Sequence, residues 1–179
     1  MDSEDNTLSL HTKVGLGHVE HVRKILDKEC LDTENLCDVL HYAVSYGQVE
    51  VARLLIVEYK CPVDCRNKTN QTPLHIACKK GHLSVVKMLV SEHKADLYKR
   101  DKDNDTPLHE AAWCGQTDIV LCLIDEFSCN PSITGIEGRT TLHHASHQGH
   151  TKLVETLLTH YNLDPLTVDD NGNLSLIHI

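Results

Sequence analysis

The chain has 179 residues, a formal net charge of −9 at pH 7, and only one tryptophan and one phenylalanine. This acidic balance argues against a general nucleic-acid binder, which needs a basic stripe to neutralise phosphates. The polar, acidic residues 1–6 argue against a secretory signal, and the lack of an apolar run of about 18 residues argues against a membrane span.

A unit of 34 residues repeats along the chain. Leu-His occurs at 10–11 and 40–41, and the full marker Thr-Pro-Leu-His follows at 72–75 and 106–109, then as Thr-Thr-Leu-His at 140–143. Thr predicts a helix cap and Pro the first helical position, so each marker predicts the start of a helix. Glycines at the same interval predict the turn to a second helix, whose paired apolar residues form one buried stripe. These glycines are Gly47, Gly81, Gly115 and Gly149.

The units resemble ankyrin repeats in the Thr-Pro-Leu-His opening, the Ala-x-x-x-Gly-His segment at 77–82 and the second helix rich in Val and Leu. The resemblance implies an all-α ankyrin-repeat solenoid, a single domain over residues 1–179 of stacked helix-turn-helix units joined by β-hairpin-like loops. We expect units at approximately 6–33, 34–66, 67–100, 101–134 and 135–168, with a truncated sixth unit at 169–179.

The units depart from the family at the end of the second helix, where the usual glycine is missing. Each unit is also about one residue longer than the usual ankyrin length near 33. We therefore expect an extended second helix or a wider exit turn.

The last six residues, 174–179, stand where a sixth unit would continue. They also match the translation of a common sequencing adaptor, which favours an artefact over a divergent repeat start. Two functional classes stay open from the sequence. The array is either a protein-binding scaffold in itself, or the targeting or regulatory region of a larger protein such as a kinase, a ligase or a channel.

No motif for nucleophilic catalysis or phosphate binding is present, so we expect no enzyme, no catalytic residue and no cofactor. His143 and His147 share one helical face and would bind zinc only with a third ligand. Two of the four histidines at 143–150 occupy repeat positions, which favours no metal site. Cys61 and Cys65 lack the spacing of a zinc knuckle and predict a loop. The eight cysteines suit reduced thiols in a cytoplasmic protein.

The resemblance implies that hairpin tips and first helices form a concave face that binds a partner protein. Residues just before the repeat glycines vary from unit to unit while the framework stays fixed, as a recognition surface should. Trp113 is the strongest candidate, because exposed aromatic residues are enriched among binding hot spots. The alternative is that its ring lies over the next unit's helix. We expect a monomer that binds neither nucleic acid nor membrane, and these partner-binding residues: Tyr46, Lys79, Lys80, Asp103, Asp105, Glu110, Trp113, Arg139 and His147.

Overall fold

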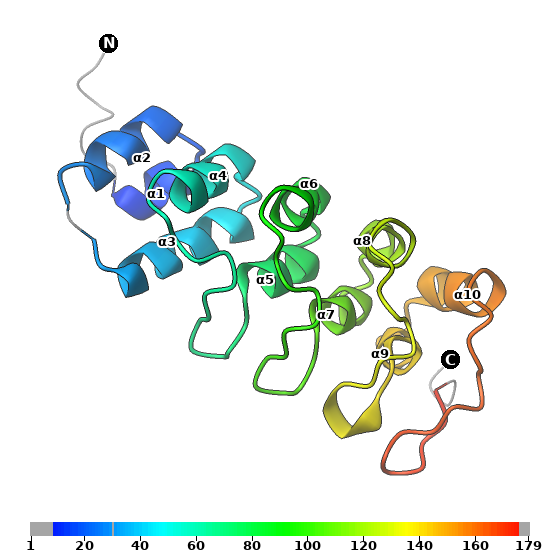
Figure 1. The fold of residues 1–179 in the computed structure, drawn as a ribbon. Helices are drawn as coiled ribbons and strands as arrows, with labels where there is room; N and C mark the ends of the chain where they lie inside the picture. Colours follow the sequence, from blue (N-terminus) through cyan, green and yellow to red (C-terminus); the bar gives the residue numbers. More distant parts are fainter. Residues whose placement is uncertain (1–8, 30, 176–179) are drawn as a thin grey trace.

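Helices stack in pairs along an elongated array (Figure 1). The computed structural model describes residues 9–29 and 31–175. The α-helices of this part form five pairs: α1 (Leu10–Gly15), α2 (Val19–Leu26), α3 (Thr33–Ser45), α4 (Val49–Val57), α5 (Pro73–Lys80), α6 (Leu83–Lys87), α7 (Pro107–Trp113), α8 (Thr117–Leu121), α9 (Thr141–His147) and α10 (Thr151–Thr159). The predicted all-α solenoid is confirmed. Residues 6–8 and 30 of the expected first unit and 176–179 of the truncated sixth unit lie outside the described residues.

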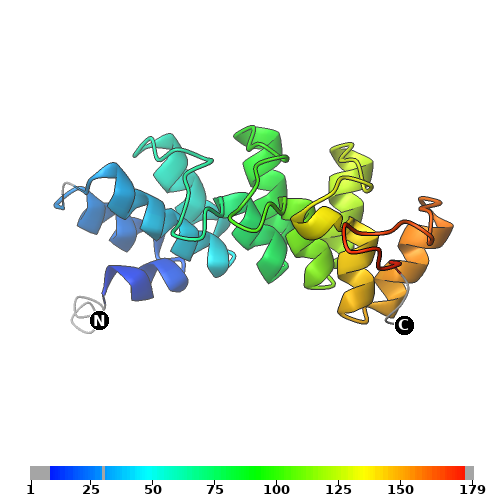
Figure 2. The same cartoon turned by 90° about the horizontal axis from the view of Figure 1, so that it is seen from below.

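The first helices of the pairs lie in one row and the second helices in another, with the loops between units projecting beyond the first row (Figures 1 and 2). The last two loops close as hairpins through antiparallel bridges, one between Thr134 and Thr140 and one between Val168 and Leu174. None of the described helices has both the length and the apolar character to cross a membrane.

The repeated Thr and His of each marker set the start of the first helix. Thr106 is the N-cap of α7, Pro107 its first residue, and the backbone N–H of Thr106 donates to Nδ1 of His109 at 3.1 Å. Nε2–H of His109 donates to the carbonyl oxygen of Ile133 in the next loop at 2.9 Å. The same histidine therefore caps its own helix and ties it to the next unit. His75 and His143 make the corresponding bonds.

The core runs through the whole array and consists mainly of aliphatic side chains. Ala77, Ala111 and Ala145 are fully buried where α5, α7 and α9 pack against one another, because a larger side chain would hold the first helices apart. The second to fifth units each bury a fully enclosed leucine of the second helix or its π-helical continuation, such as Leu89 and Leu123. The stacked helices thus form a core without a cluster of large aromatic rings.

Neighbouring units are also joined by hydrogen bonds from the residue that follows each repeat glycine. Nε2–H of His82 donates to the carbonyl oxygen of Ser45, and Nε2–H of His150 donates to that of Trp113, both at 2.9 Å. Gly47 has a φ of 72°, and a Cβ there would lie 2.9 Å from Nδ1 of His82. Glycine is required at this turn both for its left-handed backbone and for the close approach of the next unit.

The family usually has a glycine after the second helix, and this chain has other residues there. Four residues other than glycine take the left-handed conformation after the second helices, with φ between 51° and 58°: Lys60, Lys94, Ser128 and Asn162. In the third and fourth units the second helix continues into a π-helical turn, η1 (Met88–Glu92) and η2 (Cys122–Glu126). A π turn holds one more residue than an α turn, so it accommodates the additional residue of these units. The sequence predicted an extended second helix or a wider exit turn, and these π turns both extend and widen the end of the helix in the third and fourth units.

Candidate partner-binding site

A pocket of about 290 Å³ opens between the first helices of the third, fourth and fifth units and the loops that precede them. The loops before α7 and α9 supply three of the residues that were predicted to bind a partner. Helices α5 and α7 supply three more. The lining residues are Lys79, Asp103, Asp105, Glu110, Trp113, Ile136, Arg139 and His144. Six of the nine residues expected to bind a partner therefore share one pocket.

Glu110 lines this pocket and is only 9% exposed. Its Oε1 accepts a hydrogen bond from Nε2 of Gln71 at 2.6 Å, and its Oε2 lies 3.3 Å from Nζ of Lys79. Burial raises the pKa of the Glu110 carboxyl above its ordinary value, although Lys79 opposes the change. The pocket thus contains a carboxylate that is held in position by two neighbours and shielded from water.

Asp105 joins the loop before α7 to the next unit. Its Oδ1 accepts a hydrogen bond from the backbone N–H of Ile136 at 2.9 Å and lies 3.5 Å from Nε2 of His144. Burial alone would raise the pKa of the Asp105 carboxyl, but the contact with His144 and the bond from Ile136 bring it below its ordinary value. The lowered pKa favours the ionised form of Asp105. Its contacts with Ile136 and His144 hold these three lining residues of the pocket together.

Asp105, His109 and His144 are close enough together to suggest a metal site, since their ligand atoms lie within 4.8 Å of one another. However, Nδ1 of His109 accepts the bond from Thr106, and its Nε2–H donates to Ile133. Burial and the nearby His144 lower the pKa of His109 to about 4. His109 has no lone pair free for an ion, so this group does not form a complete metal site.

The Trp113 side chain forms one edge of the pocket and is 37% exposed. Its ring stacks on that of His147 with a centroid distance of 5.3 Å and an interplanar angle of 20°. It meets the ring of His144 edge-on at 5.7 Å. The ring packs on α9 of the next unit, as one interpretation of the sequence expected. It is also partly exposed, as the other interpretation, a binding residue, requires.

The other predicted residues differ in their surroundings. Arg139 pairs with Glu137 at 2.9 Å and with Asp169 at 3.3 Å, while Asp103 is half-exposed at the pocket rim. His147 lies beside the pocket through its contact with Trp113. His147 is therefore one of three predicted residues that do not line the pocket, and Tyr46 and Lys80 are the other two. Tyr46 packs on Tyr42, nearer the first unit, and Lys80 is exposed at the end of α5.

The histidine pair considered in the sequence analysis as a conditional zinc site, His143 and His147, has other contacts in the structure. Nδ1 of His143 accepts a hydrogen bond from the backbone N–H of Thr140, and its Nε2–H donates to the carbonyl oxygen of Asn173 at 3.3 Å. His147 instead stacks on Trp113. His143 is a structural residue of its unit, like His75 and His109.

Sequence reasoning missed two of the lining residues, Ile136 and His144. His144 stands one unit after Glu110, at the slot that Tyr42 and Ile76 occupy in earlier units. Comparing that slot across the units would have identified His144 as variable in the same way as Glu110. A comparison across the units does not identify Ile136. It lies between two glycines in a loop that differs from the corresponding loops of the other units.

Arg100, in the loop before α7, has a structural role. Nη1 of Arg100 donates to the carbonyl oxygen of Asn104 in its own loop at 2.7 Å and to that of Thr134 in the next loop at 2.8 Å. This guanidinium therefore holds two loops together.

Two sequence-family comparisons cover most of the chain. The family model described as ankyrin repeats in three copies matches residues 40–135. The model of a single ankyrin repeat matches residues 137–170. No curated protein matches the chain.

Proposed function

Because the chain belongs to the ankyrin repeat family, we propose that it is a non-catalytic scaffold that binds a partner protein through its concave face. Arrays of this kind generally present an extended surface for protein recognition. The proposal concerns the array itself, whether it acts alone or within a longer polypeptide.

The exposed part of the Trp113 ring beside the pocket is the observation that carries this proposal. Large aromatic residues supply much of the binding energy in protein interfaces, especially beside a pocket that excludes water. The neighbouring units hold Lys79 and His147 at the same slot, so the fold itself does not require tryptophan there.

The charges around the pocket suggest what the partner presents. Asp103 is half-exposed at the rim, and the chain as a whole carries a net charge of −9. A partner segment with an apolar side chain for Trp113 and a basic side chain for Asp103 would complement both features.

Peptides selected against the full chain from a random library would test the proposal. We expect them to bind at least about tenfold more weakly to the Trp113→Ser variant, since truncating a hot spot costs about 2 kcal/mol or more. Ser45 holds this slot in the second unit, so the substitution suits the fold. Tyr98→Ser is the matched control, because Tyr98 is an exposed aromatic residue that does not line the pocket. Equal affinity for the wild type and the Trp113→Ser variant would overturn the proposal.

A further inference from the structure

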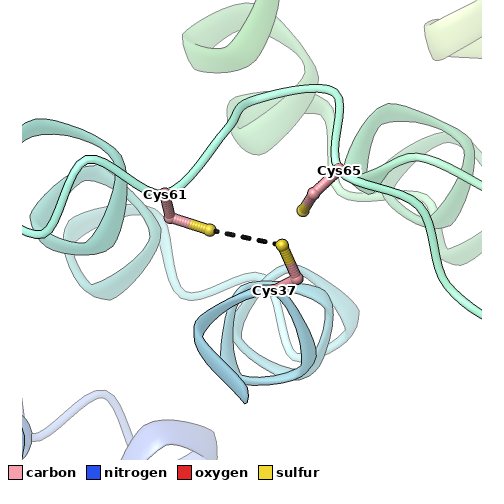
Figure 3. Close-up of side chains that lie close together, drawn as sticks. All are labelled: Cys37, Cys61 and Cys65. Carbon is pink, nitrogen blue, oxygen red and sulfur yellow. Dashed lines mark hydrogen bonds between the residues drawn. The ribbon is translucent and has the colours of Figure 1, made fainter. Parts of the chain in front are cut away.

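Three cysteines from separate parts of the second unit converge at the exit of α4 (Figure 3). Cys37 lies in the early part of α3, and Cys61 and Cys65 lie in the loop after α4. The sulfurs of Cys37 and Cys61 are 4.0 Å apart, and all three sulfurs lie within 4.8 Å of one another. The partner-binding pocket does not involve any of these residues.

The backbone explains why the sulfurs meet. The N–H of Cys61 donates to the carbonyl oxygen of Leu55 at 3.0 Å, which ties the exit loop to the last turn of α4. The N–H of Cys65 donates to the carbonyl oxygen of Pro62 at 3.1 Å and closes a tight turn. This turn brings Cys65 back toward Cys61, and Figure 3 shows both side chains directed toward Cys37.

We propose that Cys37, Cys61 and Cys65 form a binding site for a thiophilic metal ion of the Zn²⁺ type. Soft thiolate ligands select such ions over Mg²⁺ or Ca²⁺. Each thiol gives its proton to the solvent as its S–metal bond forms. The ion joins α3 to the loop after α4 and so stabilises the second unit.

The distances suit this ligand set. Three sulfurs no more than 4.8 Å apart enclose a point at most about 2.8 Å from each of them, because that bound is the edge divided by √3, against a Zn–S bond of about 2.3 Å. Two thiolates on one tetrahedral ion are about 3.8 Å apart, close to the 4.0 Å between Cys37 and Cys61. Shifts of a few tenths of an ångström would complete the site.

Burial also agrees with an ion held by three ligands. Cys61 is 3% exposed and Cys37 is 9% exposed, while Cys65 is half-buried. A fourth position on the Cys65 side is therefore open to a water molecule, an arrangement known for zinc with three protein ligands.

A disulfide between Cys37 and Cys61 is the competing use of these sulfurs. A disulfide would join only two of the three sulfurs. A metal ion accounts for the convergence of all three within 4.8 Å, so the metal site is the better interpretation.

Cadmium titration of the full chain, kept reduced with a phosphine and stripped of metal by a chelator, tests the site. Cd²⁺ bound by thiolates has an ultraviolet charge-transfer band, which the 14 histidines do not produce. We expect this band to saturate at one ion per chain. We also expect Zn²⁺ in excess to compete with Cd²⁺ for this site, and Zn²⁺ alone to raise the melting temperature.

The variants Cys37→Ser, Cys61→Ser and Cys65→Ser should each weaken binding by at least about tenfold, since even the loss of an outer-shell partner costs that much. Cys65→Ser is the most informative, because this half-buried loop position disturbs the helices least. Cys114→Ser, also half-buried but outside the cluster, is the control and should bind as the wild type does. The proposal is overturned by an unchanged band in a folded Cys65→Ser variant, or by a wild type that takes up no ion. A wild type that binds no ion but readily oxidises to a Cys37–Cys61 disulfide would favour the competing use.

Discussion

Nε2 of His144 lies 3.5 Å from Oδ1 of Asp105, which links helix α9 to the loop that precedes α7. The same oxygen accepts the backbone N–H of Ile136 at 2.9 Å. Asp105 therefore joins the fourth unit to both the loop and the first helix of the fifth. Stability of the array depends on such contacts between neighbouring units, since no unit buries both its faces alone.

Replacing Asp105 with Ala should destabilise the array by about 2 kcal/mol, because the backbone N–H of Ile136 would lose its acceptor and the buried ring of His144 would lose its neighbouring carboxylate. Urea unfolding followed by circular dichroism would measure the change. Asp103→Ala is the matched control in the same loop. Its side chain is 49% exposed, and the expected effect is within about 0.5 kcal/mol. Equal effects of the two substitutions would contradict this role of Asp105.

The free energy of unfolding should decrease as pH falls from about 6.5 to about 4, owing to His109. Its pKa is about 4 in the folded chain, lowered chiefly by burial. In this window the unfolded chain binds a proton that the folded chain does not, so acid favours unfolding. The full contribution of His109 is on the order of 3 kcal/mol. Burial also lowers the pKa of His75 and of His143, which act in the same direction.

Urea unfolding at several pH values would measure this dependence in the wild type and in His109→Gln. The variant is expected to be less stable at neutral pH, because the bonds to Thr106 and Ile133 are lost or weakened. Its pH slope should be smaller by up to about 1.4 kcal/mol per pH unit. The same slope in both proteins would show that His109 is not the group responsible.

The sequence predicted those features that depend on local chemistry. Thr106 and Pro107 start α7 where the repeat placed them, and Gly81 and Gly115 have the positive φ expected of them. Six of the nine expected site residues line one pocket, because the repeat frame fixes which positions face the first helices of neighbouring units. Their role in binding stays a prediction.

Features that depend on how a loop folds over a helix could not be predicted. Cys37 is 24 residues before Cys61, and their contact depends on the turn that the chain makes after α4. The sequence shows that each unit has one additional residue. It does not show whether a longer helix or a wider turn accommodates that residue. The structure forms the π turns η1 and η2 in the third and fourth units, a choice that the repeat pattern does not indicate.

Trp113→Ser should separate binding from stability. Loss of the stacking on His147 and of the edge contact with His144 is expected to cost about 1 kcal/mol of folding free energy. The loss of partner affinity should be larger, on the order of 2 kcal/mol or more. Calorimetric binding and thermal unfolding of the same preparations would measure both. A stability loss that exceeds the affinity loss would assign the ring a mainly structural role.

Binding can also be followed directly, because Trp113 is the only tryptophan of the chain. A partner that covers the pocket should protect its fluorescence from quenching by acrylamide, since the ring is 37% exposed in the free chain. His147→Ala is expected to increase quenching of the free chain by removing the stacked ring. A ligand that binds tightly without changing the quenching would bind at a different surface.

Ser128→Gly should stabilise the array by about 0.5 to 1 kcal/mol. Ser128 has a φ of 58°. The left-handed conformation costs a residue other than glycine roughly 1–2 kcal/mol, and glycine removes this cost. Glycine also has greater freedom in the unfolded chain, which reduces the gain in folding free energy by about 0.5–1 kcal/mol. Its side chain is exposed, so little packing is lost. The midpoint of urea unfolding should rise. Asn162→Gly is the control for the mechanism, because asparagine already tolerates this conformation, and its gain should be smaller. Ser128→Val should destabilise the array, since a β-branched side chain is least compatible with a positive φ. If Gly and Val change the midpoint in the same direction, backbone strain at the exit does not limit the stability of this unit.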